Sequence, residues 1–296
     1  MESLSILIPV YNRNCSELIS DLHAQACTLG IPFELIVADD HSTDAEALNA
    51  VCDTASSLEH CRLIALRQNI GRSAIRNLLA DNATYGKLLF MDCDAAVCSP
   101  QYLACYIEAS GKADVVCGGA RHSDTLPRPG VELRWRYEKN ADRQRSAEYR
   151  GRTPYARFTP FNFLISRDVF QSIRFGTTFK GYGYEDVLFG LELERRGISI
   201  LHIDNPLLHL GIEDNATYLG KTEEAIRNLL AHKSDIQQGS TLLTHYNRIC
   251  GLHLRPLLRA TAKLFLKPIK RNLLGSNPSL RLFALYKLFF LSIQQA

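Results

Sequence analysis

The sequence lacks several features that would assign it to a specialised class of protein. Its nine cysteines are odd in number and scattered, and no two form a C-x-x-C pair, so we expect neither a disulfide framework nor a zinc ribbon. No internal repeat is visible. The first apolar run is not followed by G-x-G-x-x-G, which argues against a dinucleotide-dependent oxidoreductase. Met1 and Glu2 lead directly into strand-like residues 4–11, so we expect no signal peptide and a cytosolic protein.

The composition is that of an ordinary globular protein. Hydrophobic residues make up 46% and charged residues 22% of the 296 positions, which excludes a disordered, collagen-like or low-complexity chain. Charge is unevenly distributed, because residues 251–296 contain eight basic side chains and no acidic one. The first 250 residues hold 26 basic and 31 acidic side chains, a net charge of −5. An acidic body with a basic tail indicates two separate roles, and we expect no nucleic-acid partner.

Apolar runs of strand length alternate with helical patterns through the first half of the chain. The runs are Ser5–Val10, Glu34–Ala38, Arg62–Leu66, Leu88–Met91 and Asp114–Cys117. Helical periodicity occupies residues 18–26, 45–57, 72–81 and 100–110. This alternation predicts an α/β fold with a mostly parallel central sheet flanked by helices. Ligands bind at the carboxyl ends of the strands in such sheets.

The second half is less regular. Basic residues gather between positions 134 and 152, which indicates a helix or a mobile excursion from the sheet. Residues 161–166 and 198–203 predict strands, and Glu185–Gly197 predicts a helix. Thr222 is predicted to be the N-cap of another helix. We expect a catalytic domain over residues 1–212 and a C-terminal helical region over residues 213–296.

The C-terminal tail is both apolar and basic. Its most apolar run, Leu282–Ile293, is interrupted by Lys287 and is shorter than the roughly 20 residues of a transmembrane helix. One interpretation is a basic amphipathic helix that lies on anionic lipid at the cytoplasmic face of the inner membrane. The other is a helical pair that packs on the body or on a second copy, as in a homodimer. We favour the membrane surface, because a packed helix seldom lacks acidic residues altogether.

Two carboxylates, Asp92 and Asp94, follow the fourth apolar run. Hard divalent cations prefer oxygen ligands, and Mg²⁺ or Mn²⁺ is commonly held by one or two carboxylates together with substrate phosphate. Close carboxylates also repel each other unless a cation or another partner compensates. The alternative is a solvent-exposed strand end with acidic turn residues.

Two further motifs lie between the first and fourth runs. Asp39 and Asp40 end the second run, where a carboxylate can accept a hydrogen bond from a pyrimidine base, unless the segment only caps the following helix. In the segment Asn69–Asn77, a glycine permits a tight turn before a helix that carries Arg72 and Arg76 on one face. Two arginines near the positive end of a helix suit a diphosphate. The alternative is a pair of solvent-exposed arginines.

A fourth motif, Gly181–Asp186, opens the helix predicted after residue 184. Its aromatic residues can stack on a sugar, and a carboxylate at the helix start can act as a general base on a hydroxyl. The alternative is simple capping of the helix. Two histidines follow: we expect His202 to be structural, whereas His209 falls just past a strand and could complete a metal site.

In this order and spacing, the motifs resemble those of the family 2 glycosyltransferases, whose catalytic domain has the GT-A fold. The resemblance covers roughly residues 3–211 and includes the opening segment Ile8–Asn12. Gly181–Asp186 also resembles the acceptor-side motif of galactosyltransferase-type GT-A enzymes. One departure from the family pattern is His41, at a position where glycine is common.

The resemblance implies a role for each matching residue. Asp186 would be the catalytic base, Asp94 and His209 would bind Mn²⁺ or Mg²⁺, and Pro9 and Tyr11 would lie against the nucleotide base. The residues implied to bind the nucleotide-sugar are Pro9, Tyr11, Asn12, Asp39, Asp40, Asn69, Arg76, Asp92 and Cys93. Those implied to bind the acceptor are Tyr182, Tyr184 and Glu185.

These roles imply an inverting glycosyltransferase. It would move a hexose or N-acetylhexosamine from a UDP-sugar to a hydroxyl of a glycan or lipid-linked glycan in cell-surface polysaccharide synthesis. A sugar nucleotidyltransferase would carry a glycine-rich basic loop after its first strand, and the segment Pro9–Asn12 is not one. A non-catalytic nucleotide-sugar-binding or membrane scaffold protein is the alternative from another class. Such a protein would tolerate loss of Asp94 or Asp186, so the presence of both residues favours the enzyme.

Overall fold

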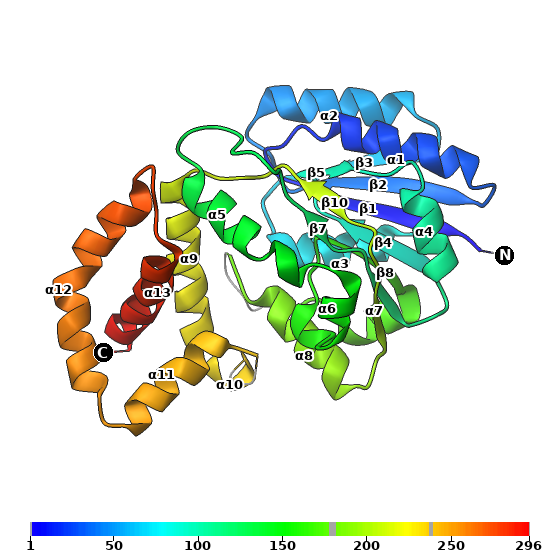
Figure 1. Ribbon diagram of the computed structural model, residues 1–296. Coiled ribbons are helices and arrows are strands. Elements are labelled where there is room, and N and C mark those ends of the chain that lie inside the picture. The colour runs from blue at the N-terminus through cyan, green and yellow to red at the C-terminus, as the bar shows by residue number, and fades with distance from the viewer. Residues whose placement is uncertain (1, 178–181, 237–238, 296) are drawn as a thin grey trace. The chain divides into compact units, whose positions relative to one another are not determined.

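The computed structural model describes residues 2–177, 182–236 and 239–295, which form two compact units. The first unit comprises residues 1–121, 143–177 and 189–211. The second comprises residues 122–142, 178–188 and 212–296. Figure 1 labels their helices and strands.

Among the described residues, a seven-stranded sheet forms the centre of the first unit, in the order β3-β2-β1-β4-β8-β6-β9. Its strands are β1 (Leu4–Val10), β2 (Phe33–Asp39), β3 (Cys61–Ala65), β4 (Lys87–Met91), β6 (Val115–Cys117), β8 (Asn162–Ser166) and β9 (Ile200–His202). β1 pairs in parallel with β2 and β4, whereas β8 runs antiparallel between β4 and β6. The predicted α/β fold with a mostly parallel central sheet is therefore confirmed.

Helices cover both faces of this sheet, which explains why its central strands read as continuous apolar runs. Alternate side chains of β1 belong to different cores, with Ile6 and Ile8 in one and Leu7 in the other. The first core includes residues of α1 (Ser16–Thr28), α2 (Ala45–Ser57) and α4 (Tyr102–Ala109). The second includes residues of α3 (Arg72–Asn82), α7 (Arg167–Ile173) and the part of α8 (Glu185–Arg195) that belongs to this unit.

A second, three-stranded sheet of the described residues was not predicted. It consists of β5 (Ala95–Val97), β10 (Leu207–His209) and β7 (Ala120–Arg121), in the order β5-β10-β7. β10 runs antiparallel to β5 and places His209 opposite Ala95. His209 is therefore the last residue of a strand, not a residue just past one, and its partner directly follows Asp94.

The basic segment after residue 134 is helical, which was one of the two predicted alternatives. It contains α5 (Glu132–Asn140), the 3₁₀ turn η1 (Asp142–Gln144), α6 (Ala147–Gly151) and a second 3₁₀ turn, η2 (Tyr155–Arg157). In the first unit, the buried Arg150 donates hydrogen bonds to the carbonyl oxygens of Cys117 (3.1 Å) and Ile203 (2.7 Å). It also contacts His202 Nδ1 at 2.7 Å, so His202 is a structural residue as expected.

The second unit is helical in its C-terminal part. Its helices there are α9 (Asn215–Ala231), α10 (Lys233–Ile236), α11 (Thr241–Gly251), α12 (Arg255–Leu274) and α13 (Leu280–Gln294). The prediction that Thr222 is an N-cap is wrong, because Thr222 lies inside α9 and donates to the Tyr218 carbonyl oxygen at 2.8 Å. The N-cap is Asp214, whose carboxylate accepts from the amides of Ala216 and Thr217. No helix among residues 2–177, 182–236 and 239–295 is both long and apolar enough to cross a membrane.

The most apolar run of the tail packs inside the second unit. Phe283, Tyr286 and Phe289 of α13 are buried in its core. Glu223 of α9 provides an acidic partner for the tail. Its carboxylate accepts a hydrogen bond from Tyr286 (2.6 Å) and forms an ion pair with Lys270 (2.9 Å). For α13, the structure therefore has the packed helix that was the alternative to the membrane surface.

Candidate active site

Asp39 and Asp40 lie at the carboxyl end of β2, and both are buried. Asp39 accepts hydrogen bonds from the amide (3.0 Å) and the hydroxyl of Ser42. The backbone amide of Asn12, just after β1, donates to Ser42 Oγ at 2.8 Å. The side-chain oxygen Oδ1 of Asn12 accepts from the Thr43 backbone amide at 2.7 Å. These bonds join the loops that follow two neighbouring strands.

Asp40 connects β2 to the start of α3. Its two carboxylate oxygens accept from the amides of Ile70 (2.7 Å) and Gly71 (2.9 Å), while Asn69 Nδ2 donates to its carbonyl oxygen at 2.9 Å. Gly71 has φ = 87°, which only glycine adopts readily. Asp40 therefore fixes the tight turn that the sequence predicted, and its carboxylate is already occupied by backbone amides.

Arg76 is buried on α3, and its guanidinium forms an ion pair with Asp92 at the end of β4. Its side chain is only 4% exposed, whereas that of Asp92 is 28% exposed. Burial raises the pKa of Asp92. The positive charge of Arg76 opposes this increase, and the neighbouring Asp94 adds to it. The arginine thus supplies the compensating charge that two close carboxylates require.

Asp94 is held from the second sheet of the first unit. His209 Nε2 lies 3.3 Å from its carboxylate, and the Leu210 amide donates to its carbonyl oxygen at 2.7 Å. Gly211 packs directly on the carboxylate, where a Cβ would collide with it. Burial by itself would raise the pKa of Asp94, but the hydrogen bond and charge of His209, together with Arg72, lower it overall.

Asp94 and His209 together offer a carboxylate oxygen and an imidazole nitrogen. Carboxylates suit Mg²⁺ and Mn²⁺, and an imidazole favours the transition metal of the two. An aspartate is ionised at neutral pH, as a carboxylate ligand must be, and His209 would bind a cation as a neutral imidazole. These residues fit a divalent cation.

The remaining predicted donor-side residues surround the same strand ends. Pro9 is half-buried within β1, Tyr11 is 49% exposed just after it, and Cys93 lies between the two aspartates. Burial raises the pKa of Cys93 well above its usual range, so it is a neutral thiol. Arg13 was not predicted, yet its charge contributes to the lowered pKa of Asp94. The sequence signal that could have identified Arg13 is its position directly after the segment Ile8–Asn12.

The predicted acceptor-side residues lie in the second unit, and Gly181 is outside the described residues. Glu185 and Asp186 begin α8. Glu185 is buried and accepts from the Gly183 amide at 3.0 Å, and Asp186 Oδ1 accepts from the Val187 amide at 2.8 Å. Gly183 has φ = 104°, and a Cβ there would meet Ala225. The glycine is thus required by both its backbone conformation and its close contact.

The two tyrosines of this motif are anchored differently. The Tyr182 carbonyl oxygen accepts from Asn228 Nδ2 at 3.0 Å, and Lys221 lies over its ring at 5.3 Å. Tyr184 packs against the core of the second unit, and burial raises the pKa of its hydroxyl. Tyr182 therefore presents an aromatic ring beside a cation, whereas Tyr184 contributes to packing.

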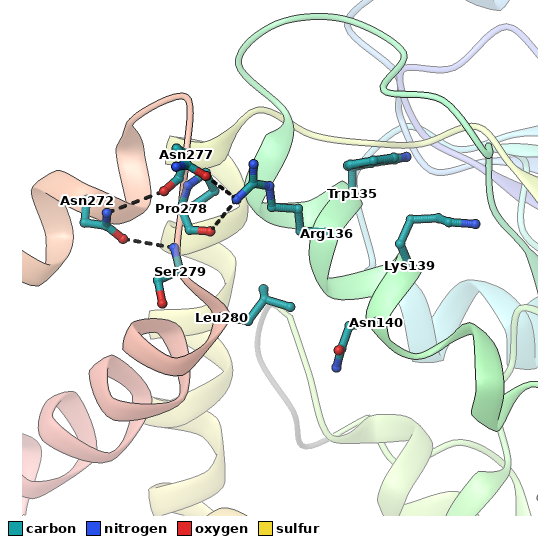
Figure 2. A pocket seen from close by; sticks show the side chains of 9 residues that line it. All are labelled: Trp135, Arg136, Lys139, Asn140, Asn272, Asn277, Pro278, Ser279 and Leu280. Carbon is teal, nitrogen blue, oxygen red and sulfur yellow. Dashed lines mark hydrogen bonds between the residues drawn. The ribbon is translucent and has the colours of Figure 1, made fainter.

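The second unit also contains a hollow of about 740 Å³ that the sequence did not predict (Figure 2). None of the predicted site residues lines it. Arg136 reaches across to the loop before α13 and donates to Asn277 Oδ1 (2.5 Å) and the Pro278 carbonyl oxygen (3.1 Å). The hollow is lined by Trp135, Arg136, Lys139, Asn140, Asn272, Asn277, Pro278, Ser279 and Leu280.

Comparison with known proteins gives the family. The family model described as Glycosyl transferase family 2 matches residues 5–174, more than half of the chain. An N-acetylglucosaminyltransferase of Azorhizobium caulinodans is 31% identical over 97 residues, which cover 32% of this chain and 24% of that protein. The match thus spans about a quarter of the length of this relative.

Two solved structures share the fold at low sequence identity. The mannosyltransferase PcManGT from Pyrobaculum calidifontis, in complex with GDP-Man and Mn²⁺, has a TM-score of 0.58 at 15% identity, over 99% of this chain and 86% of that one. S. aureus TarS 1-349 has a TM-score of 0.51 at 18% identity, over 99% and 92% of the respective chains. The fold is that of the GT-A glycosyltransferases.

Proposed function

The chain belongs to glycosyl transferase family 2, and from this premise we propose that it is an inverting transferase that uses a UDP-sugar. It moves a hexose or N-acetylhexosamine to a hydroxyl of a glycan or lipid-linked glycan, in the synthesis of a cell-surface polysaccharide. The observation that carries this proposal is the Asp92–Asp94 centre at the end of β4, where Arg76 compensates one carboxylate and His209 adjoins the other.

The donor nucleotide lies over the carboxyl ends of β1 and β2 in this proposal. Tyr11 is exposed there and can lie against the base, with Pro9 beside it. Asp39 reads the base, while Asp40, Asn12 and Asn69 hold the surrounding loops. Arg76 forms an ion pair with Asp92 and keeps it in place for the ribose or sugar beside the diphosphate.

Asp94 and His209 hold a divalent cation, Mn²⁺ or Mg²⁺. When bound, the cation supplies positive charge that stabilises the departing diphosphate. The chain's own contribution is an ionised carboxylate on Asp94, whose backbone carbonyl is bonded by the Leu210 amide and whose side chain packs on Gly211. The presence of Mn²⁺ in the Pyrobaculum complex supports this assignment.

On the acceptor side, Asp186 takes the proton from the attacking hydroxyl. Glu185, Tyr182 and Tyr184 shape the acceptor site, and Glu185 also holds the tight loop at Gly183. We assign catalysis to residues 1–212 and a supporting helical role to residues 213–296. A lipid-linked acceptor would place the enzyme at the cytoplasmic membrane face.

The test is release of nucleoside diphosphate from a panel of UDP-, GDP- and dTDP-sugars with Mn²⁺ and without acceptor. Asp94→Asn is compared with Asp53→Asn, which changes an exposed carboxylate of α2. We expect slow hydrolysis of a UDP-sugar that falls at least tenfold in Asp94→Asn and is unchanged in the control. If no donor is hydrolysed and calorimetry detects no nucleotide binding with Mn²⁺, the non-catalytic scaffold replaces this proposal.

A further inference from the structure

The segment that contains α12 exposes an unusual number of large apolar side chains. Six such residues lie between positions 252 and 274, compared with four in the rest of the described chain. Leu264 is 69% exposed and Leu257 is 60% exposed. The six are Leu252, Leu254, Leu257, Leu264, Phe265 and Leu274. Clustered apolar exposure of this kind marks an interaction surface.

Three exposed cations lie beside these leucines. Lys263, Lys267 and Arg271 follow each other at intervals of four residues, so they form one stripe along α12. No carboxylate in the described part of the chain forms an ion pair with them, whereas Lys270 is paired with Glu223. The outer face of α12, defined by Leu257, Leu264 and these three cations, is therefore both apolar and positively charged.

This outer face is not needed to hold the helix in the second unit. The opposite side of α12 buries Leu258, Ala262, Ile269 and Leu273 in the core. The loop that follows is fixed by the Arg136 bonds shown in Figure 2, and Asn272 Oδ1 accepts from the Ser279 amide at 3.0 Å. The helix is thus anchored at its inner side and presents the outer face as a fixed surface.

We infer that the outer face of α12 binds an anionic lipid bilayer. Its leucines enter the boundary between headgroups and acyl chains, and its cations meet the lipid phosphates. A second copy of the chain is a poorer partner, because a symmetric contact would place the cationic stripes against each other. The surface differs from the predicted run Leu282–Ile293, which packs inside. This inference deepens the proposed function, since it rests on a lipid-linked acceptor at the membrane.

The experiment is flotation of the full chain with vesicles of phosphatidylcholine alone or with about 30% phosphatidylglycerol, an anionic lipid. We expect flotation with the anionic vesicles, weakened by salt. Lys263→Gln combined with Lys267→Gln should weaken partitioning by roughly 30-fold, from the contribution of each cation near an anionic surface. The control, Lys112→Gln with Arg152→Gln, removes the same charge from exposed positions of the first unit and should leave flotation unchanged.

A second variant tests the apolar contribution. Leu257→Gln with Leu264→Gln should weaken partitioning at least tenfold at constant net charge, and an unchanged melting temperature would show that it still folds. The inference would be overturned if all variants float equally or if the wild-type chain does not float. It would also be overturned if light scattering shows a dimer that the leucine variant abolishes. Donor hydrolysis without vesicles is measured separately, so failure of the lipid surface is distinguishable from failure of the proposed transferase.

Discussion

The two units hold their candidate site residues in different ways. In the first unit, the acids at the strand ends are fixed by distant partners, as when Arg76 of α3 pairs with Asp92 and His209 adjoins Asp94. In the second, Glu185 and Asp186 are bonded to amides one or two residues away. The carboxylates of Asp92 and Asp94 are therefore held by long-range contacts, whereas those of Glu185 and Asp186 accept hydrogen bonds from amides of their own turn. Substitution of Arg76 should therefore affect stability and activity together, whereas substitution of Asp186 should affect mainly activity.

The largest expected effect is the loss of acceptor turnover when Asp186 is substituted, and measuring it sharpens the comparison between the two units. Asp186→Asn keeps an oxygen that can accept from Val187, so we expect a change in unfolding free energy below about 0.5 kcal/mol. Loss of the general base should lower acceptor turnover by about 10²–10⁴-fold, with donor affinity unchanged. Turnover with a saturating donor and calorimetry of donor binding measure the two effects. Retention of more than a tenth of wild-type turnover would remove Asp186 from the role of base.

The same contrast explains what the sequence could and could not predict. Strand ends such as Asp39 and Asp92 follow continuous apolar runs, so their places in the sheet could be anticipated. β5, β7 and β10 are only two or three residues long, and they exist because distant segments pair, which leaves little local signal. The partner of Arg76 was missed for the same reason, since the ion pair joins residues 16 positions apart.

A smaller effect is expected when the central ion pair of the first unit is broken. Arg76→Met leaves Asp92 beside Asp94 without its compensating cation, which should cost about 2 kcal/mol, less than a fully buried pair because Asp92 is 28% exposed. Donor hydrolysis should fall as well. Lys112→Met removes a 3.7 Å surface pair with Glu108 and should cost less than about 1 kcal/mol. Urea unfolding measures the loss of stability in the two variants, and equal losses would contradict the distinction between the central ion pair and a surface pair.

The smallest effect on activity is expected at His202, whose substitution should change the pH dependence of stability within the first unit. Burial, with the charge of Arg150 nearby, lowers the pKa of His202 to about 4, despite its hydrogen bond to Pro154. The unfolded chain binds this proton near pH 6.5, so stability is fully present above that pH and falls as the pH drops toward 4, by about 3 kcal/mol. His202→Gln should flatten this dependence in urea unfolding, whereas His23→Gln, at a partly exposed position, should not. A wild-type slope in His202→Gln would show that other groups cause the acid sensitivity.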